Sequence, residues 1–218
     1  MKTIHRLWTP GIALIKEHKK ALLVLNVLVF GTIVGVMVAS VINPDLTAAS
    51  RNSILSEVST ASGADGTFRA YEEHRFFLAL IYTFAANLGY GALGATTLPS
   101  LVIPFSGIAF LAYRSVLYGT LFAPVGTGAV FDTTAGFVLH MITLTIEVEG
   151  YILAALAAWI LGRMTLQPRA YGFPSRWTGY TNGLKATAQL YVQVLTVILV
   201  GATFEVVEIL WLAPAFGA

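Results

Sequence analysis

The feature that most constrains this chain is an uncharged apolar run of 22 residues, from Ala21 to Ile42. At about 1.5 Å per residue, a helix of that length crosses the ~30 Å hydrocarbon layer of a membrane. The run is too long for the apolar part of a cleaved signal peptide, which has about 7–15 residues. It therefore predicts a retained membrane-spanning helix.

The composition extends this interpretation to the whole chain. Of 218 residues, 56% are hydrophobic and only 11% are charged, and the mean hydropathy is +0.75. A soluble domain has about 25% charged residues, and one soluble core of this size cannot bury so many apolar side chains. These values exclude an ordinary soluble enzyme, a disordered regulator and a nucleic-acid-binding domain. The absence of cysteine excludes disulfides, a thiolate nucleophile and Cys-ligated metals.

Five apolar segments are expected to be helical spans, because they are continuous and about twice as long as the strands of a membrane barrel. They cover about residues 21–42, 76–96, 105–123, 131–161 and 188–213. We therefore expect an all-α fold, a single polytopic transmembrane helical bundle over residues 1–218. The fourth segment is too long for one straight span, so it is either one tilted, protruding helix, which we favour, or a helix broken near Gly150.

The charges between the spans predict an orientation. Residues 1–20 and the linker 163–187 are basic, whereas the linker 43–75 has five acids and three arginines. By the positive-inside rule, the amino terminus and residues 163–187 face the cytoplasm and residues 43–75 face outward, across the inner (cytoplasmic) membrane of a cell. Five crossings satisfy all three assignments.

Two of the connecting segments have further features. Residues 1–20 are either simple basic flanking sequence or an amphipathic helix on the inner surface of the membrane. The linker 43–75 is expected to be a loop with a short helix near Ile54, and the linker 163–187 an ordered interfacial loop.

Several polar and ionisable residues lie within the spans. A charge at mid-depth costs at least ~2.5–3.5 kcal/mol, so these side chains are expected to meet in the interior as a polar core. The residues concerned are Asn87, Arg114, His140, Glu147, Glu149, Glu205 and Glu208.

Helical spacing predicts which of these residues face each other. His140 and Glu147 are seven residues apart and share a helix face, whereas Glu149 points to the opposite face. Glu205 and Glu208, three residues apart, also share a face. We expect Arg114 to pair with Glu147 or Glu205. Such a core either stabilises the packing of the helices against each other, which we favour, or provides a proton or ion path.

The chain lacks the motifs of common membrane enzymes. It contains no HExxH, no GxSxG and no Walker loop. We therefore expect neither enzymatic activity nor a cofactor, and no metal site. Gly31 and Gly35 form a GxxxG pair, which is typical of close helix–helix contacts in membranes.

Three stretches resemble the stage II sporulation protein M family of multi-pass membrane proteins. They are Leu139–Arg163, with His140, Glu147 or Glu149 and Gly162, then Val197–Trp211, with Glu205, and the Asn- and Gly-bearing stretch Phe84–Gly119. The family usually has Gly after the His, where this chain has Met141.

This resemblance implies a non-enzymatic membrane scaffold or accessory subunit of a larger complex. Its partners would be other membrane proteins and membrane lipids, in a hetero-complex or a homo-oligomer. The alternative is a small proton- or ion-coupled transporter or channel that uses the buried carboxylates.

Overall fold

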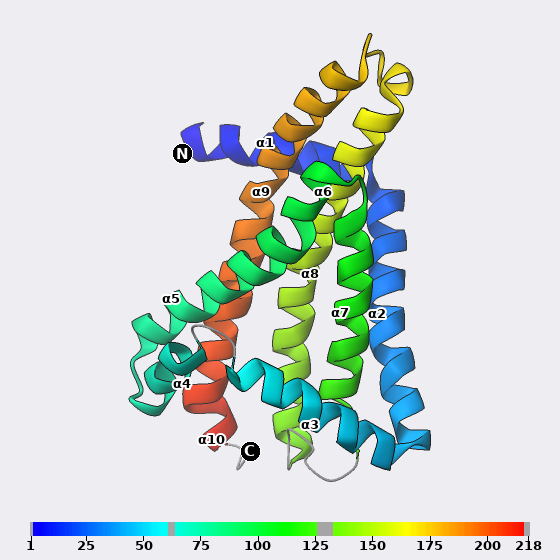
Figure 1. Cartoon of the computed structure of the whole chain (residues 1–218). Helices are drawn as coiled ribbons and strands as arrows, with labels where there is room; N and C mark the ends of the chain where they lie inside the picture. The colour runs from blue at the N-terminus through cyan, green and yellow to red at the C-terminus, as the bar shows by residue number, and fades with distance from the viewer. Residues whose placement is uncertain (1, 61–63, 126–132, 216–218) are drawn as a thin grey trace.

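The computed structural model describes residues 2–60, 64–125 and 133–215, which are almost entirely helical and include no strand (Figure 1). The predicted all-α fold class is therefore confirmed. The helices in chain order are α1 (Lys2–Glu17), α2 (Lys19–Ile42), α3 (Pro44–Thr60), α4 (Ala64–Glu72), α5 (Phe76–Ala86), the π-helix η1 (Asn87–Thr97), α6 (Leu98–Val102), α7 (Ser106–Leu121), α8 (Thr134–Leu166), the 3₁₀ helix η2 (Pro168–Tyr171), α9 (Arg176–Val207), the π-helix η3 (Glu208–Leu212) and α10 (Ala213–Ala215).

Within the described residues, four helical stretches are long and apolar enough to cross a membrane. They are α2, the continuous stretch α5–η1–α6, α8, and the continuous stretch α9–η3–α10. This is the architecture of a helical membrane protein. The segment predicted at 105–123 forms α7, which has 16 residues and is therefore shorter than these four.

Consecutive long helices run in alternating directions between two ends of the molecule (Figure 1). One end carries α1 and the connection between α8 and α9, and we call it the basic end because Lys16, Lys19, Lys20 and Arg169 lie there. The α3–α4 end carries those two helices and the carboxyl end of α9. Helix α8 is the central element and is buried along most of its length, whereas α2 lies at the outside.

Helix α8 is continuous over 33 residues, about 50 Å. The favoured alternative of one long helix is thus confirmed, and there is no break at Gly150. A Cβ on Gly150 would lie 2.7 Å from Ile198 Cγ1, so this glycine lets α8 and α9 approach closely. The predicted start of this span at 131 lies outside the described residues.

Both long linkers contain more helix than predicted. The expected loop over 43–75 is largely the helices α3 and α4. The expected loop over 163–187 is reduced to residues 167–175, because α8 continues to Leu166 and α9 begins at Arg176. In both cases the tertiary contacts of these polar segments, which sequence periodicity does not report, stabilise the helix.

The side chain of Arg51 on α3 caps the carboxyl-terminal end of α7. Its side chain is fully buried. Its Nε donates to Leu121 O at 3.0 Å, Nη2 to Ala123 O at 2.6 Å and Nη1 to Val125 O at 3.1 Å. A cation among unpaired carbonyl groups at a helix carboxyl end is favourable. The sequence interpretation had treated Arg51 as an ordinary external charge.

The amino-terminal segment is a helix packed on the bundle. α1 lies across α9 at the basic end (Figure 1). Gln193 Nε2 donates to Trp8 O at 3.0 Å, and Gly11 leaves room for the Gln193 side chain. Leu14 and Ile15 contact the main hydrophobic core. The segment is therefore helical, as the amphipathic-helix alternative requires, and its place on the inner surface of the membrane stays a prediction.

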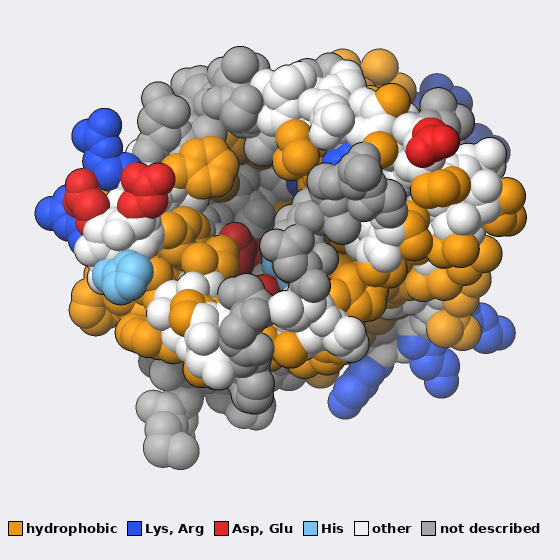
Figure 2. Space-filling model, turned by 90° about the horizontal axis from the view of Figure 1, so that it is seen from below, with side chains coloured by type: hydrophobic (Ala, Val, Ile, Leu, Met, Phe, Trp, Pro, Cys, Tyr) orange, Lys and Arg blue, Asp and Glu red, His pale blue; other side chains and the backbone are white. Residues whose placement is uncertain are grey.

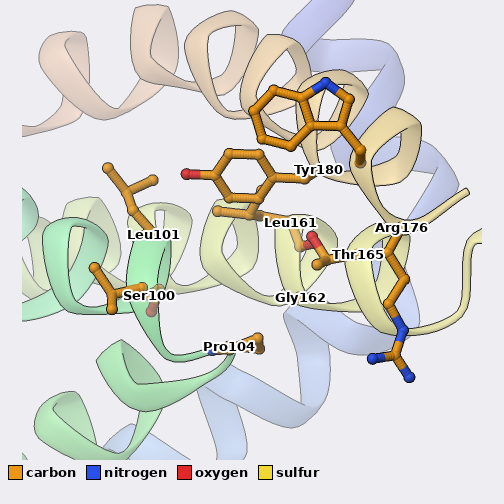
Figure 3. A pocket seen from close by; sticks show the side chains of 10 residues that line it. Ser100, Leu101, Pro104, Leu161, Gly162, Thr165, Arg176 and Tyr180 are labelled. Carbon is orange, nitrogen blue, oxygen red and sulfur yellow. The ribbon is translucent and has the colours of Figure 1, made fainter.

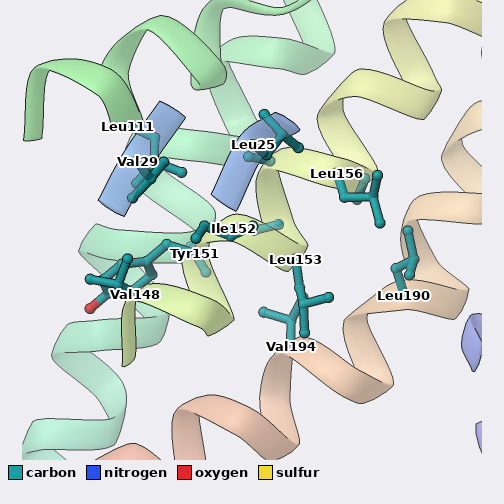
Figure 4. Packing of buried hydrophobic residues seen from close by; sticks show 14 of the residues in the cluster. Leu25, Val29, Leu111, Val148, Tyr151, Ile152, Leu153, Leu156, Leu190 and Val194 are labelled. Carbon is teal, nitrogen blue, oxygen red and sulfur yellow. The ribbon is translucent and has the colours of Figure 1, made fainter. Parts of the chain in front are cut away.

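The half of the bundle nearer the basic end has an apolar centre. Side chains of α8 meet those of α2, α7 and α9 there (Figure 4). The buried residues include Leu25, Val29, Leu111, Ile152, Leu156, Leu190 and Val194. The polar residues of the spans gather instead in the other half.

Candidate functional site: a buried polar cluster

The polar cluster lies between α5–η1, α8 and α9–η3, towards the α3–α4 end. Asn87 and Glu208 are the first residues of the two π-helices in the described part of the chain, η1 and η3. π-Helical turns are rare, and many occur at functional sites. The rare π-helical backbone therefore begins at the residues that supply polar side chains to the cluster.

Asn87 joins η1 to α8. Its Nδ2 donates to Glu147 Oε1, and its Oδ1 accepts a hydrogen bond from Tyr151 OH at 2.8 Å. The Tyr151 ring fits against η1 because Gly91 has no side chain, and a Cβ there would lie 2.3 Å from a ring carbon. Asn87, predicted to belong to the polar core, thus has two polar partners on α8.

The predicted ion pair of Arg114 with Glu147 or Glu205 is wrong. Nη2 of Arg114 donates to Tyr118 OH, and the guanidinium carbon lies 5.3 Å from the Tyr118 ring centroid and 4.9 Å from that of Tyr151. A guanidinium over aromatic faces is stabilised by the ring quadrupole without a carboxylate. Arg114 is therefore linked to Glu147 only indirectly, through Tyr151 and Asn87.

Arg114 takes part in none of the three ion pairs that are found between described residues. Two are at the ends of the molecule, His18–Glu17 and Arg75–Glu73. The third, His140–Glu208, is inside the cluster, with 3.2 Å between Nδ1 and Oε1.

Glu208 is deeply buried, at 3% exposed, and has partners for both oxygens. Besides His140, Thr143 donates its hydroxyl hydrogen to Glu208 Oε2. The Phe122 ring lies against His140, with 4.7 Å between the ring centroids. The start of η3 is thereby tied to α8 by two polar contacts, and Phe122, which follows α7, packs against the same histidine.

Glu147 and Glu205 lie in the same α8–α9 interface. A Cβ on Gly201 would come within 2.7 Å of Glu147 Cγ, so Glu147 crosses α9 where that helix has no side chain. Glu205 is one turn further along α9 and is an electrostatic neighbour of Glu147. Two carboxyl groups therefore share one small, poorly hydrated region.

Tyr71 of α4 extends the cluster towards the α3–α4 end. Its hydroxyl is 2.7 Å from Thr83 Oγ1. Burial and the nearby Glu205 raise the pKa of Tyr71, which keeps the hydroxyl protonated at neutral pH. Tyr71 can therefore serve as a neutral hydrogen-bonding group beside the carboxylates.

The structure sorts the predicted site residues clearly. Glu149 points to the opposite face of α8, as its spacing predicted, and its polar neighbour there is Asn26 of α2. Arg114 lies at the edge of the cluster. The residues brought together are Asn87, His140, Glu147, Glu205 and Glu208.

Sequence reasoning missed the uncharged members of the cluster, although a signal for them exists. Thr143 lies four residues before Glu147 and Tyr151 four residues after it, so both continue the stripe that begins at His140. Tyr118 likewise follows Arg114 by four residues. A search for polar hydroxyls on the same helix face would have found them.

A hollow opens at the α3–α4 end of the molecule. Figure 2 shows acidic and histidine side chains in its depth, with hydrophobic groups along part of its edge. The described residues contain no group of three or more His, Asp or Glu side chains placed to hold a metal ion. What the cluster can do chemically is hold a proton among several carboxyl groups or bind a cation between them.

Comparison with known protein families, with curated proteins and with solved structures finds no match. The fold and the cluster themselves define a class, a helical membrane protein with a buried polar cluster.

Proposed function

We propose that this protein is a non-enzymatic scaffold or accessory subunit of a larger membrane protein complex, the role implied by the resemblance to the stage II sporulation protein M family. In this proposal the chain crosses the inner membrane five times, with α7 as the short span and the amino terminus in the cytoplasm. The charge distribution supports that orientation, because the basic end carries Lys16, Lys19, Lys20, Arg163, Arg169, Arg176 and Lys185.

The observation that best supports a role in assembly is the outward-facing GxxxG pair on α2. Gly31 and Gly35 are exposed, and a Cβ on either would meet nothing within 4 Å. The buried face of α2 is the opposite one, with Leu25, Val29 and Ile33. Small residues on an outer helix face allow a second membrane helix to approach closely.

The test is co-purification after gentle detergent extraction, followed by crosslinking and identification of the proteins retained. We expect Gly31→Leu/Gly35→Leu to lose a defined partner, or a second copy of the chain, that the wild type retains. The matched control is Val34→Leu/Val38→Leu on exposed positions of the same helix. Retention of the same proteins by both variants would contradict the proposal.

The hollow supports a second candidate function, a proton- or cation-coupled transporter or channel. The polar cluster contains three glutamates, Glu147, Glu205 and Glu208, and the basic side chains around it, among the described residues, are those of His140 and the peripheral Arg114. In proteoliposomes, transport would depend on pH and be lost in Glu147→Gln and Glu205→Gln. Glu149→Gln is the matched control, because Glu149 is on the same helix but outside the cluster. Absence of any flux in the wild type would contradict this function.

A further inference from the structure

A groove opens at the basic end, away from the carboxylate cluster. It lies between the α6–α7 turn, the end of α8 and the start of α9, and has a volume of about 310 Å³ (Figure 3). Leu101 and Leu161 form its apolar floor, and Tyr180 lies above them. Arg176 stands at one edge.

The floor of the groove is held in place by a constrained turn. Phe105 adopts a left-handed backbone conformation, with φ of 70°, and its ring occupies the space left by Gly162. The buried Ser100 accepts a hydrogen bond from Gly107 N at 2.8 Å and donates to Thr96 O at 3.0 Å. A preformed groove of this kind binds a ligand without a large ordering cost.

The edge of the groove is cationic. Arg176 is the single charged residue among the described residues that line it. Arg176 is exposed and takes part in none of the three ion pairs between described residues. The whole segment 163–187 contains no acid. The guanidinium is therefore available to an anion from outside the chain.

Aromatic side chains next to Arg176 mark the level of the membrane surface. Trp177 is 72% exposed and stacks on Tyr180, with 5.8 Å between the ring centroids. Val102 and Ile103, at the α6–α7 turn, are also largely exposed. Tryptophan and tyrosine are enriched at membrane–water interfaces, and exposed aliphatic groups are favourable on the hydrocarbon side.

We propose that this groove is a binding site for one anionic phospholipid. The phosphate of the headgroup contacts Arg176, the glycerol region lies beside Trp177 and Tyr180, and an acyl chain covers Leu101 and Leu161. Basic pockets between membrane helices on the cytoplasmic side are suited to such headgroups. The proposal rests on the orientation proposed above, with the basic end at the cytoplasmic surface, but it uses none of the residues assigned to assembly or to transport.

The test compares lipids bound to the purified full chain by native mass spectrometry. We expect phosphatidylglycerol to be retained in preference to phosphatidylcholine. Arg176→Gln should weaken phosphatidylglycerol binding about fivefold, the contribution of one basic residue near an anionic membrane. Leu101→Trp, which fills the floor, should also weaken it. Lys185→Gln removes the same charge from an exposed position of α9 outside the groove and should leave binding unchanged.

Three results would overturn the proposal. One is equal retention of phosphatidylglycerol and phosphatidylcholine. Another is the same loss of binding in Arg176→Gln and Lys185→Gln, which would indicate a general charge effect. The third is competition by millimolar inorganic phosphate alone as effective as that by phosphatidylglycerol, which would make the site one for a free anion rather than for a lipid.

Discussion

At the scale of single residues, a charged group buried away from water needs a partner, since apolar surroundings supply none. Arg114 has two aromatic rings and a tyrosine hydroxyl, and Arg51 has three backbone carbonyls. Neither arginine has a carboxylate among its described partners. The two positions therefore predict different consequences of substitution from those of an ordinary salt bridge.

Arg114→Leu should lower the stability of the protein in detergent by about 1–2 kcal/mol, because the cation–π contacts with Tyr118 and Tyr151 are lost. Arg114→Lys should restore only part of it, since an ammonium cannot stack as a planar group does. Thermal unfolding measures both effects. A wild-type midpoint in Arg114→Leu would contradict this description of the contacts.

Arg51→Met should destabilise the protein by about 1–3 kcal/mol, because the end of α7 loses the hydrogen-bond donor of three carbonyl groups. Arg69→Met is the control, since Arg69 lies on the neighbouring α4 and is exposed. The measurement is the same thermal unfolding experiment. Equal effects of the two substitutions would show that the buried position of Arg51 contributes nothing.

At the scale of elements, the packing of the π-helix η1 against α8 requires glycine at position 91 but not at position 89. Gly91→Ala should destabilise the protein by about 1–3 kcal/mol, because the new methyl group overlaps the Tyr151 ring. Gly89→Ala is a matched control in the same helix, where a Cβ meets nothing within 4 Å. If both variants unfold at the same temperature, Tyr151 does not pack against η1 as described.

The elements also show how much of the fold the sequence predicts. Apolar runs and charge spacing predicted the long helices, the continuity of α8 and the shared face of His140 and Glu147. They did not predict η1 or η3, because π-helical turns are rare and the spacing of apolar and charged residues does not distinguish them from α-helix. Opposite charge did not predict the contacts of Arg114, because its partners are aromatic rings, Tyr118 on the same helix and Tyr151 on α8.

At the scale of the whole molecule, the absence of cysteine makes the proposed orientation directly measurable. Asn52→Cys on α3 should react with a membrane-impermeant maleimide in intact cells, and Ala170→Cys at the α8–α9 connection only after permeabilisation. Both positions are exposed in the structure. The proposed arrangement has three crossings between these two positions, namely α5–η1–α6, α7 and α8. Labelling of both positions from the same side of the membrane would contradict it.

The central claim is that Glu147 of α8 faces α9 inside the bundle and not the lipid. A Cβ on Gly201 would lie 3.5 Å from Glu147 Cα, so cysteines at these two positions would be in direct contact across the α8–α9 interface. The direct measurement is oxidative crosslinking of Glu147→Cys/Gly201→Cys, with Glu147→Cys/Val200→Cys as control, after insertion of a protease site at Gly172. Val200 is largely exposed. We predict that only the first pair holds the two fragments together after cleavage; efficient crosslinking of the second pair and not the first would contradict the account.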